Sequence, residues 1–430
     1  MHINQLFYFD RKRLKRLLTF FILIFGASAA MKLSSMKDAF YFPMLHTFHI
    51  TNEQLGATRS IYGVVQMLGY IPAMFIADRF SKKIMIPFSL LCLALIGLYF
   101  ATIPSYIGLL VVFGSLAIFG EMTYWPIMLK SVRLLGSADE QGRLFGFLEG
   151  GRGLIDIILS FASLWIFTFF ANEKAGFQHV IHFDCIVLIL TAIASYWVLE
   201  HDRIDNAEGV IASSKRILLG IKGELHKKEL WLLAFTVFFI WVTYAGLTSF
   251  IPYMRNIFSL PIVLVGVYGI INQYGLKLVG GPVAGILADK YFKSPLKTMR
   301  VAFIGGIMGL ILIIVYSRLG HSTGYTIAII LTLVMASFIF MLRALAFSPM
   351  AELKIPKSSV GSALSLVCMI GYSANIFAYA MYGKIIDIYP GTKGYDYVFM
   401  IMIICLILAY ILSSLTFKIV HNKNGSVNIE

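Results

Sequence analysis

The chain has 430 residues, of which 59% are hydrophobic and 13% charged, and its formal net charge is +14 at pH 7. A soluble protein carries about 25% charged residues, so this composition excludes a water-soluble globule. Four cysteines lie inside apolar runs, at spacings that fit neither a metal site nor a disulfide framework. They are interpreted as small core residues: Cys92, Cys185, Cys368 and Cys405.

The N-terminus has the order of segments of a secretory signal peptide. A basic stretch at 11–16 precedes an apolar run, and Ala27, Ser28 and Ala29 fit a cleavage site. The run nevertheless continues to Leu45, and the chain that follows it is itself a membrane domain. We therefore expect this segment to be retained as the first membrane helix.

Twelve apolar stretches follow one another along the chain, and each is long enough to cross about 30 Å of hydrocarbon. Because backbone polar groups in lipid must be satisfied within a segment, these stretches are interpreted as helices. The predicted fold class is an all-α membrane protein with twelve transmembrane helices. The predicted spans are 17–45, 56–78, 84–103, 106–129, 143–170, 180–199, 230–254, 262–288, 298–317, 323–348, 360–386 and 396–418.

The distribution of basic residues predicts the orientation of the helices. The two tails and the even-numbered loops hold 25 of the 36 Lys and Arg residues, which places them in the cytoplasm. The positive charge therefore indicates topology and not nucleic-acid binding, and we expect a multi-pass inner-membrane protein with both termini inside. The expected domains are a basic tail (1–16), a six-helix bundle (17–199), a partly helical cytoplasmic linker (200–229), a second six-helix bundle (230–418) and a C-terminal tail (419–430).

An internal repeat supports the division into two halves. Asp78 and Arg79 follow the second predicted helix, and Asp289 and Lys290 follow the eighth, 211 residues later. In these two loops the chain resembles the major facilitator superfamily. The resemblance implies two pseudo-symmetric six-helix bundles that work by alternating access, with the substrate site between the halves. It also implies that these four residues take part in the conformational switch.

A narrower resemblance is to the organophosphate:phosphate antiporter branch of that superfamily. It rests on Trp125-Pro126, on the segment Glu140–Arg143 and on the stretch from Pro349 to Asp387. In that branch an arginine on helix 1, an arginine on helix 7 and a histidine on helix 5 hold the phosphate. The resemblance therefore implies a divergent relative with a rebuilt site, since the corresponding positions are Ser35, Thr243 or Tyr244, and Arg152.

Ionisable residues inside the predicted helices are candidates for function, because each costs a few kcal/mol at bilayer depth. Glu149, Arg152 and Asp156 share one stripe of the fifth helix. They form either a face linked to substrate or protons, or a self-neutralising ladder that locks the helix. Lys37 and Asp38, near the outer end of the first helix, are interpreted as boundary residues.

The predicted substrate site combines cations, which bind an anionic group strongly in a dry cavity, with neutral polar side chains. The predicted substrate-binding residues are Lys32, Arg152, Lys277, Arg343, Tyr62, Gln66, Tyr244, Gln273, Tyr372 and Asn375. Burial favours the proton-carrying form of a carboxyl group, so the predicted proton-coupling residues are Glu121, Glu149 and Asp156. The alternative for Glu121 is a structural pair with Arg152 or Arg343.

The sequence therefore predicts a secondary active transporter for a small organic solute, an anion before a zwitterion such as an amino acid. Its expected partners are the solute, the lipid bilayer and a coupled proton or counter-ion, and we expect a monomer. Neither a cofactor, a metal site nor a catalytic constellation is predicted, so we do not expect an enzyme. A drug or metabolite exporter and a non-transporting membrane sensor are the alternatives.

Overall fold

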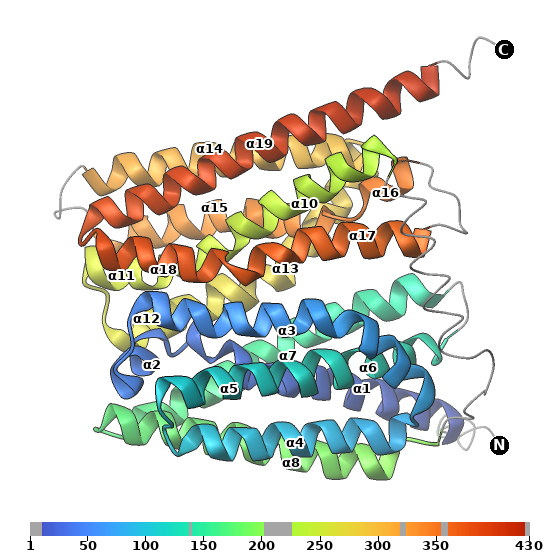
Figure 1. Ribbon diagram of the computed structural model, residues 1–430, viewed down its shortest axis with the longest axis vertical. Coiled ribbons are helices and arrows are strands. Elements are labelled where there is room, and N and C mark those ends of the chain that lie inside the picture. The colour runs from blue at the N-terminus through green and yellow to red at the C-terminus, as the bar shows by residue number, and fades with distance from the viewer. Residues whose placement is uncertain (1–10, 137–139, 202–225, 319–323, 354–359, 426–430) are drawn as a thin grey trace, which may run out of the picture. The chain divides into compact units, whose positions relative to one another are not determined.

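The computed structural model describes residues 11–136, 140–201, 226–318, 324–353 and 360–425. These residues form helices joined by loops (Figure 1). They group into two compact units, and each is described by itself. The N-terminal unit comprises Met1–Ser35 and Leu68–Ala207, and the C-terminal unit comprises Met36–Met67 and Glu208–Glu430. Most of the predicted linker, 202–225, lies outside the described residues.

The N-terminal unit is built around α8, which packs against α4 and α1. Helices α4 and α8 lie side by side, and α1 packs against both α7 and α8 (Figure 1). The helices of this unit are α1 (Arg11–Lys32), the Leu68–Arg79 part of α3 (Asn52–Arg79), α4 (Lys82–Ala101), α5 (Tyr106–Ala117), η2 (Ile118–Tyr124), α6 (Trp125–Arg133), α7 (Gln141–Thr168) and α8 (Glu173–Val198).

The C-terminal unit is organised around α10, which packs against α17 and α19, while α14 packs against α15 and α19. The segment Met36–Met67, from the first half of the sequence, belongs to this unit. Its helices are η1 (Leu33–Asp38) from Met36 onward, α2 (Tyr41–Phe48), the first part of α3, α10 (Lys228–Gly246), η4 (Leu247–Ser249), α11 (Phe250–Phe258), α12 (Ile262–Ile270), η5 (Ile271–Gly275), α13 (Leu276–Ile286), η6 (Leu287–Tyr291), α14 (Pro295–Arg318), α15 (Tyr325–Leu345), α16 (Pro349–Glu352), α17 (Val360–Tyr372), η7 (Ser373–Ile376), α18 (Ala378–Ile388) and α19 (Thr392–Gly425).

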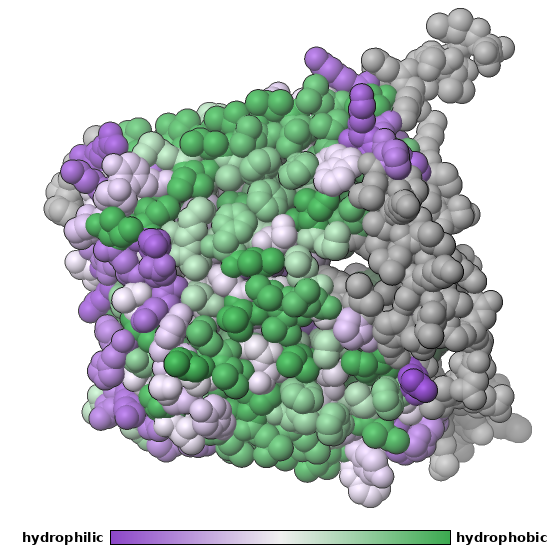
Figure 2. All heavy atoms as spheres, viewed as in Figure 1, coloured by the Kyte–Doolittle hydropathy of each residue, from purple (hydrophilic) through white to green (hydrophobic). Residues whose placement is uncertain are grey.

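The surfaces of these helices are suited to lipid. Large apolar side chains such as Leu95, Ile107 and Trp197 are exposed, which water would disfavour and hydrocarbon does not. On the face seen in Figure 2, hydrophobic side chains cover the middle of the helices and hydrophilic ones gather toward their ends. Within the described part of the chain, eleven helical stretches are long and apolar enough to cross a membrane.

The second predicted span, 56–78, is not among these eleven stretches and lies within α3, whose 28 residues extend about 42 Å. The all-α, twelve-helix fold class predicted from the sequence is therefore confirmed.

The prediction of one uninterrupted first helix over 17–45 is wrong. Helix α1 ends at Lys32, a 3₁₀ segment follows, and α2 begins at Tyr41. The hydroxyls of Ser34 and Ser35 both donate to the carbonyl oxygen of Met31, at 2.9 and 2.7 Å, and so compete with the backbone for that acceptor. Pro43 has no N–H to donate, so it fits the first turn of a new helix and not the interior of a continuous one.

Four further predicted spans contain changes of helix type, and in the seventh of the twelve spans the 3₁₀ turn η4 separates α10 from α11. Segment η2 within the fourth span and η5 within the eighth are π-helical, and η7 within the eleventh is a 3₁₀ turn. In η2 the cause is Pro126, since it cannot donate to the carbonyl four residues earlier and the turn before it widens. Short π-helical segments are frequent at functional sites. Both π-helical segments named here, η2 and η5, carry residues predicted for the site.

The sixth helix begins earlier than the predicted 180–199, at Glu173. Asn172 caps it, because its side-chain oxygen accepts a hydrogen bond from the backbone N–H of Ala175 at 3.1 Å. The added residues raise the length of α8 to 26, and its buried polar side chains therefore lie in the middle of the helix.

Candidate functional site

Arg152 lies at the centre of a polar cluster in the N-terminal unit. Its guanidinium carbon is 4.6 Å from the centre of the Trp125 ring, and its Nη1 donates to Glu149 Oε1 at 2.9 Å. The hydroxyl of Ser28 donates to the backbone carbonyl of Arg152 at 3.2 Å, which ties α7 to α1. The buried Nε of Arg152 has no hydrogen-bond partner among the described residues, so a donor remains available.

The same unit contains Asp156, one turn beyond Arg152 on α7, and Lys32, the last residue of α1. Lys32 is 6% exposed and its Nζ donates to the hydroxyl of Ser160. The same hydroxyl donates to the backbone carbonyl of Asp156 at 2.6 Å. Asp156 is also 6% exposed, whereas Glu149 is exposed, so the predicted stripe of three charges is buried only at Arg152 and Asp156.

Arg343 organises the corresponding cluster in the C-terminal unit. Its guanidinium carbon lies 5.2 Å from the ring centre of Trp241 and 4.8 Å from that of Tyr244. The hydroxyl of Tyr244 donates to Gln273 Oε1 at 3.5 Å. The ring of Tyr372 meets Trp241 edge-on at 4.8 Å. The structure therefore brings together four residues that the sequence predicted, around a tryptophan that it did not.

The Arg343 cluster contains buried donors without partners. Trp241 Nε1 and Gln273 Nε2 are buried and have no hydrogen-bond partner in the part of the chain that the structure describes. A buried donor left unsatisfied costs about 1–3 kcal/mol. Both atoms donate and neither accepts, so their chemistry matches that of a ligand with acceptor oxygens.

The C-terminal unit contains four further residues that the sequence predicted for the site. Asn375, in η7, is buried and its Oδ1 has no partner among the described residues. Tyr62 is buried beneath the guanidinium of Arg59, whose carbon lies 4.4 Å from the ring centre. Lys277 and Gln66 are half-buried on α13 and α3. The assignment of these four residues to the site stays a prediction.

The remaining predicted residues lie in the two loops and in η2. Arg79 ends α3 and is exposed, and the side chain of Asp78 lies outside the described ones. Asp289 and Lys290 are exposed in η6. Glu121 is half-buried in the π-helical η2. Their roles in switching and in proton coupling stay predictions.

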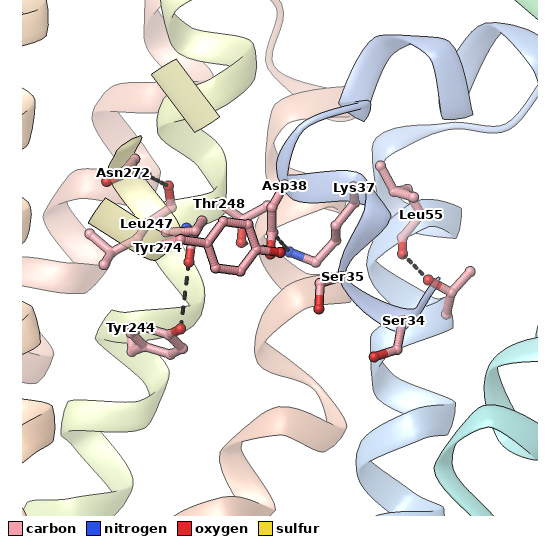
Figure 3. Close-up of polar contacts among 12 residues, drawn as sticks. Ser34, Ser35, Lys37, Asp38, Leu55, Tyr244, Leu247, Thr248, Asn272 and Tyr274 are labelled. Atoms are coloured by element: carbon pink, nitrogen blue, oxygen red, sulfur yellow. Dashed lines mark hydrogen bonds and ion pairs between the residues drawn. The ribbon is translucent and has the colours of Figure 1, made fainter. Parts of the chain in front are cut away.

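A buried ion pair in the C-terminal unit was not expected from the sequence. Lys37 and Asp38 were interpreted as boundary residues, but they are only 5% and 9% exposed, and Lys37 Nζ lies 3.0 Å from Asp38 Oδ1. Figure 3 shows Thr248 and Tyr274 beside the pair. Lys37 donates to Thr248 Oγ1 at 2.9 Å, and Tyr274 donates to Asp38 Oδ2 at 3.4 Å.

The packing around this ion pair is tight. The carbonyl oxygen of Asp38 approaches α12 so closely that a Cβ on Gly269 would lie 1.8 Å from it. Lys37 also lies over the ring of Tyr379, at 4.9 Å from its centre, and lines a small cavity with Thr248 and Tyr379. The break in the first helix explains the burial, because the residues from Met36 onward pack with the helices of the C-terminal unit and do not continue the first helix toward the surface.

A second buried acid was also missed. Asp184 lies in the middle of α8, is 2% exposed, and accepts a hydrogen bond from the hydroxyl of Ser163 at 3.2 Å. The rule that selected Glu149 and Asp156, an ionisable residue at bilayer depth, applies equally to Asp184. As for metals, no three His, Cys, Asp or Glu side chains of the described residues come together as ligands.

These features define the class of the protein: a multi-pass helical membrane protein with a cationic cluster among the helices of each of its two units. Residues 16–379 match the sequence profile of the Major Facilitator Superfamily, and the chain belongs to this superfamily. It is a secondary transporter.

Two relatives resemble the chain over nearly its full length. Inner membrane protein YihN of Escherichia coli (strain K12) is 38% identical over 389 residues, which are 90% of this chain and 92% of that protein. Inner membrane protein YqcE of the same organism is 24% identical over 415 residues, 96% of this chain and 97% of that protein.

A solved structure shares the fold. The bacterial homologue of the human lysosomal transporter Spinster, in its inward-facing and unoccupied conformation, superposes with a TM-score of 0.71 at 14% identity. The match covers 96% of this chain and 98% of that one. At this level of identity the likeness concerns the fold alone.

Proposed function

We propose that the protein moves a small organic anion across the inner membrane by alternating access. The observation that carries this proposal is the Arg343 cluster, in which a guanidinium lies beside two buried donors that lack partners: Trp241 Nε1 and Gln273 Nε2. An anion supplies acceptors to all three groups. The relatives YihN and YqcE are named as inner membrane proteins, which supports the choice of membrane.

The stacking of each arginine on a ring favours anion recognition further. A guanidinium packed against an indole loses part of its rotational freedom, which lowers the cost of forming hydrogen bonds to a carboxylate or phosphate. Arg152 over Trp125 repeats the arrangement of Arg343 over Trp241. Each unit therefore offers one oriented cation, which is what a solute held alternately by two halves requires.

The resemblance to the organophosphate:phosphate antiporters agrees with an anionic solute. The chain lacks that branch's two arginines, at Ser35 and at Thr243 or Tyr244, and has Arg152 and Arg343 in other places. We therefore propose phosphate monoesters and carboxylates as the classes to be tested first. A non-transporting sensor would bind such an anion without moving it, so uptake into proteoliposomes separates the two functions.

The test begins with a thermal-shift screen of the purified protein against carboxylates and phosphate monoesters. A compound at about 100 times its Kd should stabilise the protein by about 2.7 kcal/mol. We expect Arg343→Lys to bind the selected compound about tenfold more weakly, a loss of about 1.4 kcal/mol, because an ammonium cannot form the bidentate fork. Arg152→Lys should give a loss of similar size.

Arg300→Lys is the matched control. Arg300 also stacks on an aromatic ring, that of Phe417, at 4.6 Å, and donates to Ser414 at 3.1 Å, all within the C-terminal unit. Its replacement should leave the affinity within twofold or so. Equal affinities for wild type, Arg343→Lys and Arg300→Lys would remove Arg343 from the site, and a screen without any stabilising anion would contradict the proposal itself.

The proposed orientation, with both termini in the cytoplasm, can be tested by cysteine labelling. Lys393, exposed at the start of α19, is expected on the outer side, and position 215 in the linker on the inner side. A membrane-impermeant thiol reagent added to intact cells should modify Lys393→Cys and leave a cysteine at 215 unmodified. Labelling of position 215 from outside would reverse the topology.

A further inference from the structure

Asp184 is an acid that the proposed anion site does not use. It is the twelfth residue of α8, so it lies about 16 Å from the start of that helix, near the middle of the span. Its side chain is 2% exposed. An ionisable residue at such depth costs several kcal/mol unless it is paired or neutralised, and is therefore a functional candidate by default.

The hydrogen bonds of Asp184 are incomplete for a carboxylate. Oδ1 accepts from Ser163 Oγ at 3.2 Å, while the buried Oδ2 has no hydrogen-bond partner among the residues that the structure describes. An ionised carboxylate offers about four acceptor positions, and this one fills a single one of them. Protonation of Oδ2 would turn an unsatisfied buried acceptor into a neutral group, so burial works in favour of proton uptake.

Lys32 opposes the effect of burial on Asp184, because its positive charge favours the carboxylate. Its ammonium interacts electrostatically with Asp184 and donates to the hydroxyl of Ser160. Ser160 and Ser163 are three residues apart on α7 and therefore share one face of that helix. Ser160 thus binds Lys32, and Ser163 binds Asp184. The positive charge of Lys32 favours the ionised form of Asp184.

Other titratable groups surround this pair. Helix α8 packs against α1, α4 and α7. Besides Lys32 on α1, these helices carry Arg152 and Asp156 on α7 and the half-buried Cys92 on α4, while Cys185 follows Asp184 in α8. Among them, Lys32 is the cation that interacts electrostatically with Asp184.

We infer that Asp184 is a proton-binding site whose occupancy is set by Lys32. When Lys32 faces Asp184, its charge stabilises the carboxylate. When a solute anion engages the ammonium, that support is lost, and the carboxylate takes one proton from water to become a neutral carboxylic acid. This step rests on the proposed transport of an anion, and it would move one proton together with each anion.

Infrared spectroscopy of the purified protein tests the inference without any solute. A protonated carboxyl group has a carbonyl-stretch band that a carboxylate lacks. We expect one such band to appear as the pH is lowered from about 9 to about 6, above the range in which exposed carboxyl groups take up protons, and to be absent from Asp184→Asn over this range. In Lys32→Met the band should persist to a pH about one unit higher, because the charge that favours the carboxylate is gone.

Two further variants keep the test decisive. If Asp184→Asn does not fold, Ser163→Ala keeps the carboxyl group but removes its hydrogen-bond donor, and should also move the titration to higher pH. Asp156→Asn should retain the band. A band that survives in Asp184→Asn, that is lost in Asp156→Asn, or that does not change with pH in wild type would overturn the inference, and so would an unchanged titration in Lys32→Met.

Failure of this inference is separate from failure of the proposed function. The infrared titration uses protons as its only ligand, whereas the screen described above reads anion binding directly. A protein that binds an anion but shows no titration of Asp184 retains the proposed function and loses the proton site. A protein that shows the titration of Asp184 but binds no anion retains the proton site and loses the proposed anion transport.

Discussion

We expect Lys37→Met to destabilise the protein by about 3–5 kcal/mol, measured as the free energy of unfolding in a denaturant titration of the detergent-solubilised protein. The methionine is similar in length to lysine, so the loss is one of charge. Asp38 would then remain buried at 9% exposure without its cation, although the Tyr274 hydroxyl would still donate to it at 3.4 Å. A stranded buried carboxylate is costly because neither water nor a counter-charge compensates it.

Lys384→Met is the matched control for this substitution. Lys384 also pairs with an acid of the C-terminal unit, Glu53, at 3.5 Å, but the two side chains are 57% and 45% exposed. An exposed pair contributes about 0–1 kcal/mol, so the control should lose no more than that. Neutralising both members of the buried pair, with Lys37→Met and Asp38→Asn together, should recover much of the loss. Equal effects of Lys37→Met and Lys384→Met would return Lys37 to the boundary role that its sequence position indicated.

The helices of this protein were predictable because hydropathy depends only on the residues within each span. The third predicted span, 84–103, corresponds to α4 at Lys82–Ala101. The breaks within spans were not predictable in the same way, since they depend on local competition for hydrogen bonds. Two serines that bond to the carbonyl oxygen of Met31 and a proline at position 43 end the first helix, while its hydropathy continues without interruption.

The charged residues of the candidate site were predictable from the sequence, because ionisable side chains stand out within apolar spans. Arg152 with Glu149, and Arg343 with Tyr244, were selected from sequence and lie together in the structure. Trp241 was not selected, because an aromatic residue inside an apolar run has the same appearance in a sequence whether it packs in the core or supports a guanidinium. Its role depends on which helix faces it, and that is decided by tertiary packing.

The C-terminal unit also contains a close contact that a single methyl group should disrupt. Gly383 of α18 lies against the start of α3, where an added Cβ would be 2.2 Å from the carbonyl oxygen of Asn52. One turn later, Asp387 accepts hydrogen bonds from the backbone N–H of Asn52 at 3.2 Å and of Glu53 at 2.7 Å. The N–H groups at the first turn of a helix have no partner within that helix, and a carboxylate that accepts from them stabilises it. Asp387 therefore joins α18 to the start of α3.

We expect Gly383→Ala to separate the start of α3 from α18, because real Cβ atoms do not approach backbone atoms to within 3.0 Å and the backbone cannot rotate away as a side chain would. The bonds to Asp387 should lengthen, and Leu55, now 1% exposed, should become accessible. With the native cysteines replaced, a thiol reagent should modify Leu55→Cys at least about tenfold faster when Gly383→Ala is present, since local opening governs the reaction. Gly285→Ala is the control: it lies in α13 with nothing within 4 Å of its added Cβ, and should leave the rate unchanged. If Gly383→Ala leaves the rate as slow as Gly285→Ala does, the start of α3 tolerates displacement, and the contact between Gly383 and Asn52 does not control access to this part of the C-terminal unit.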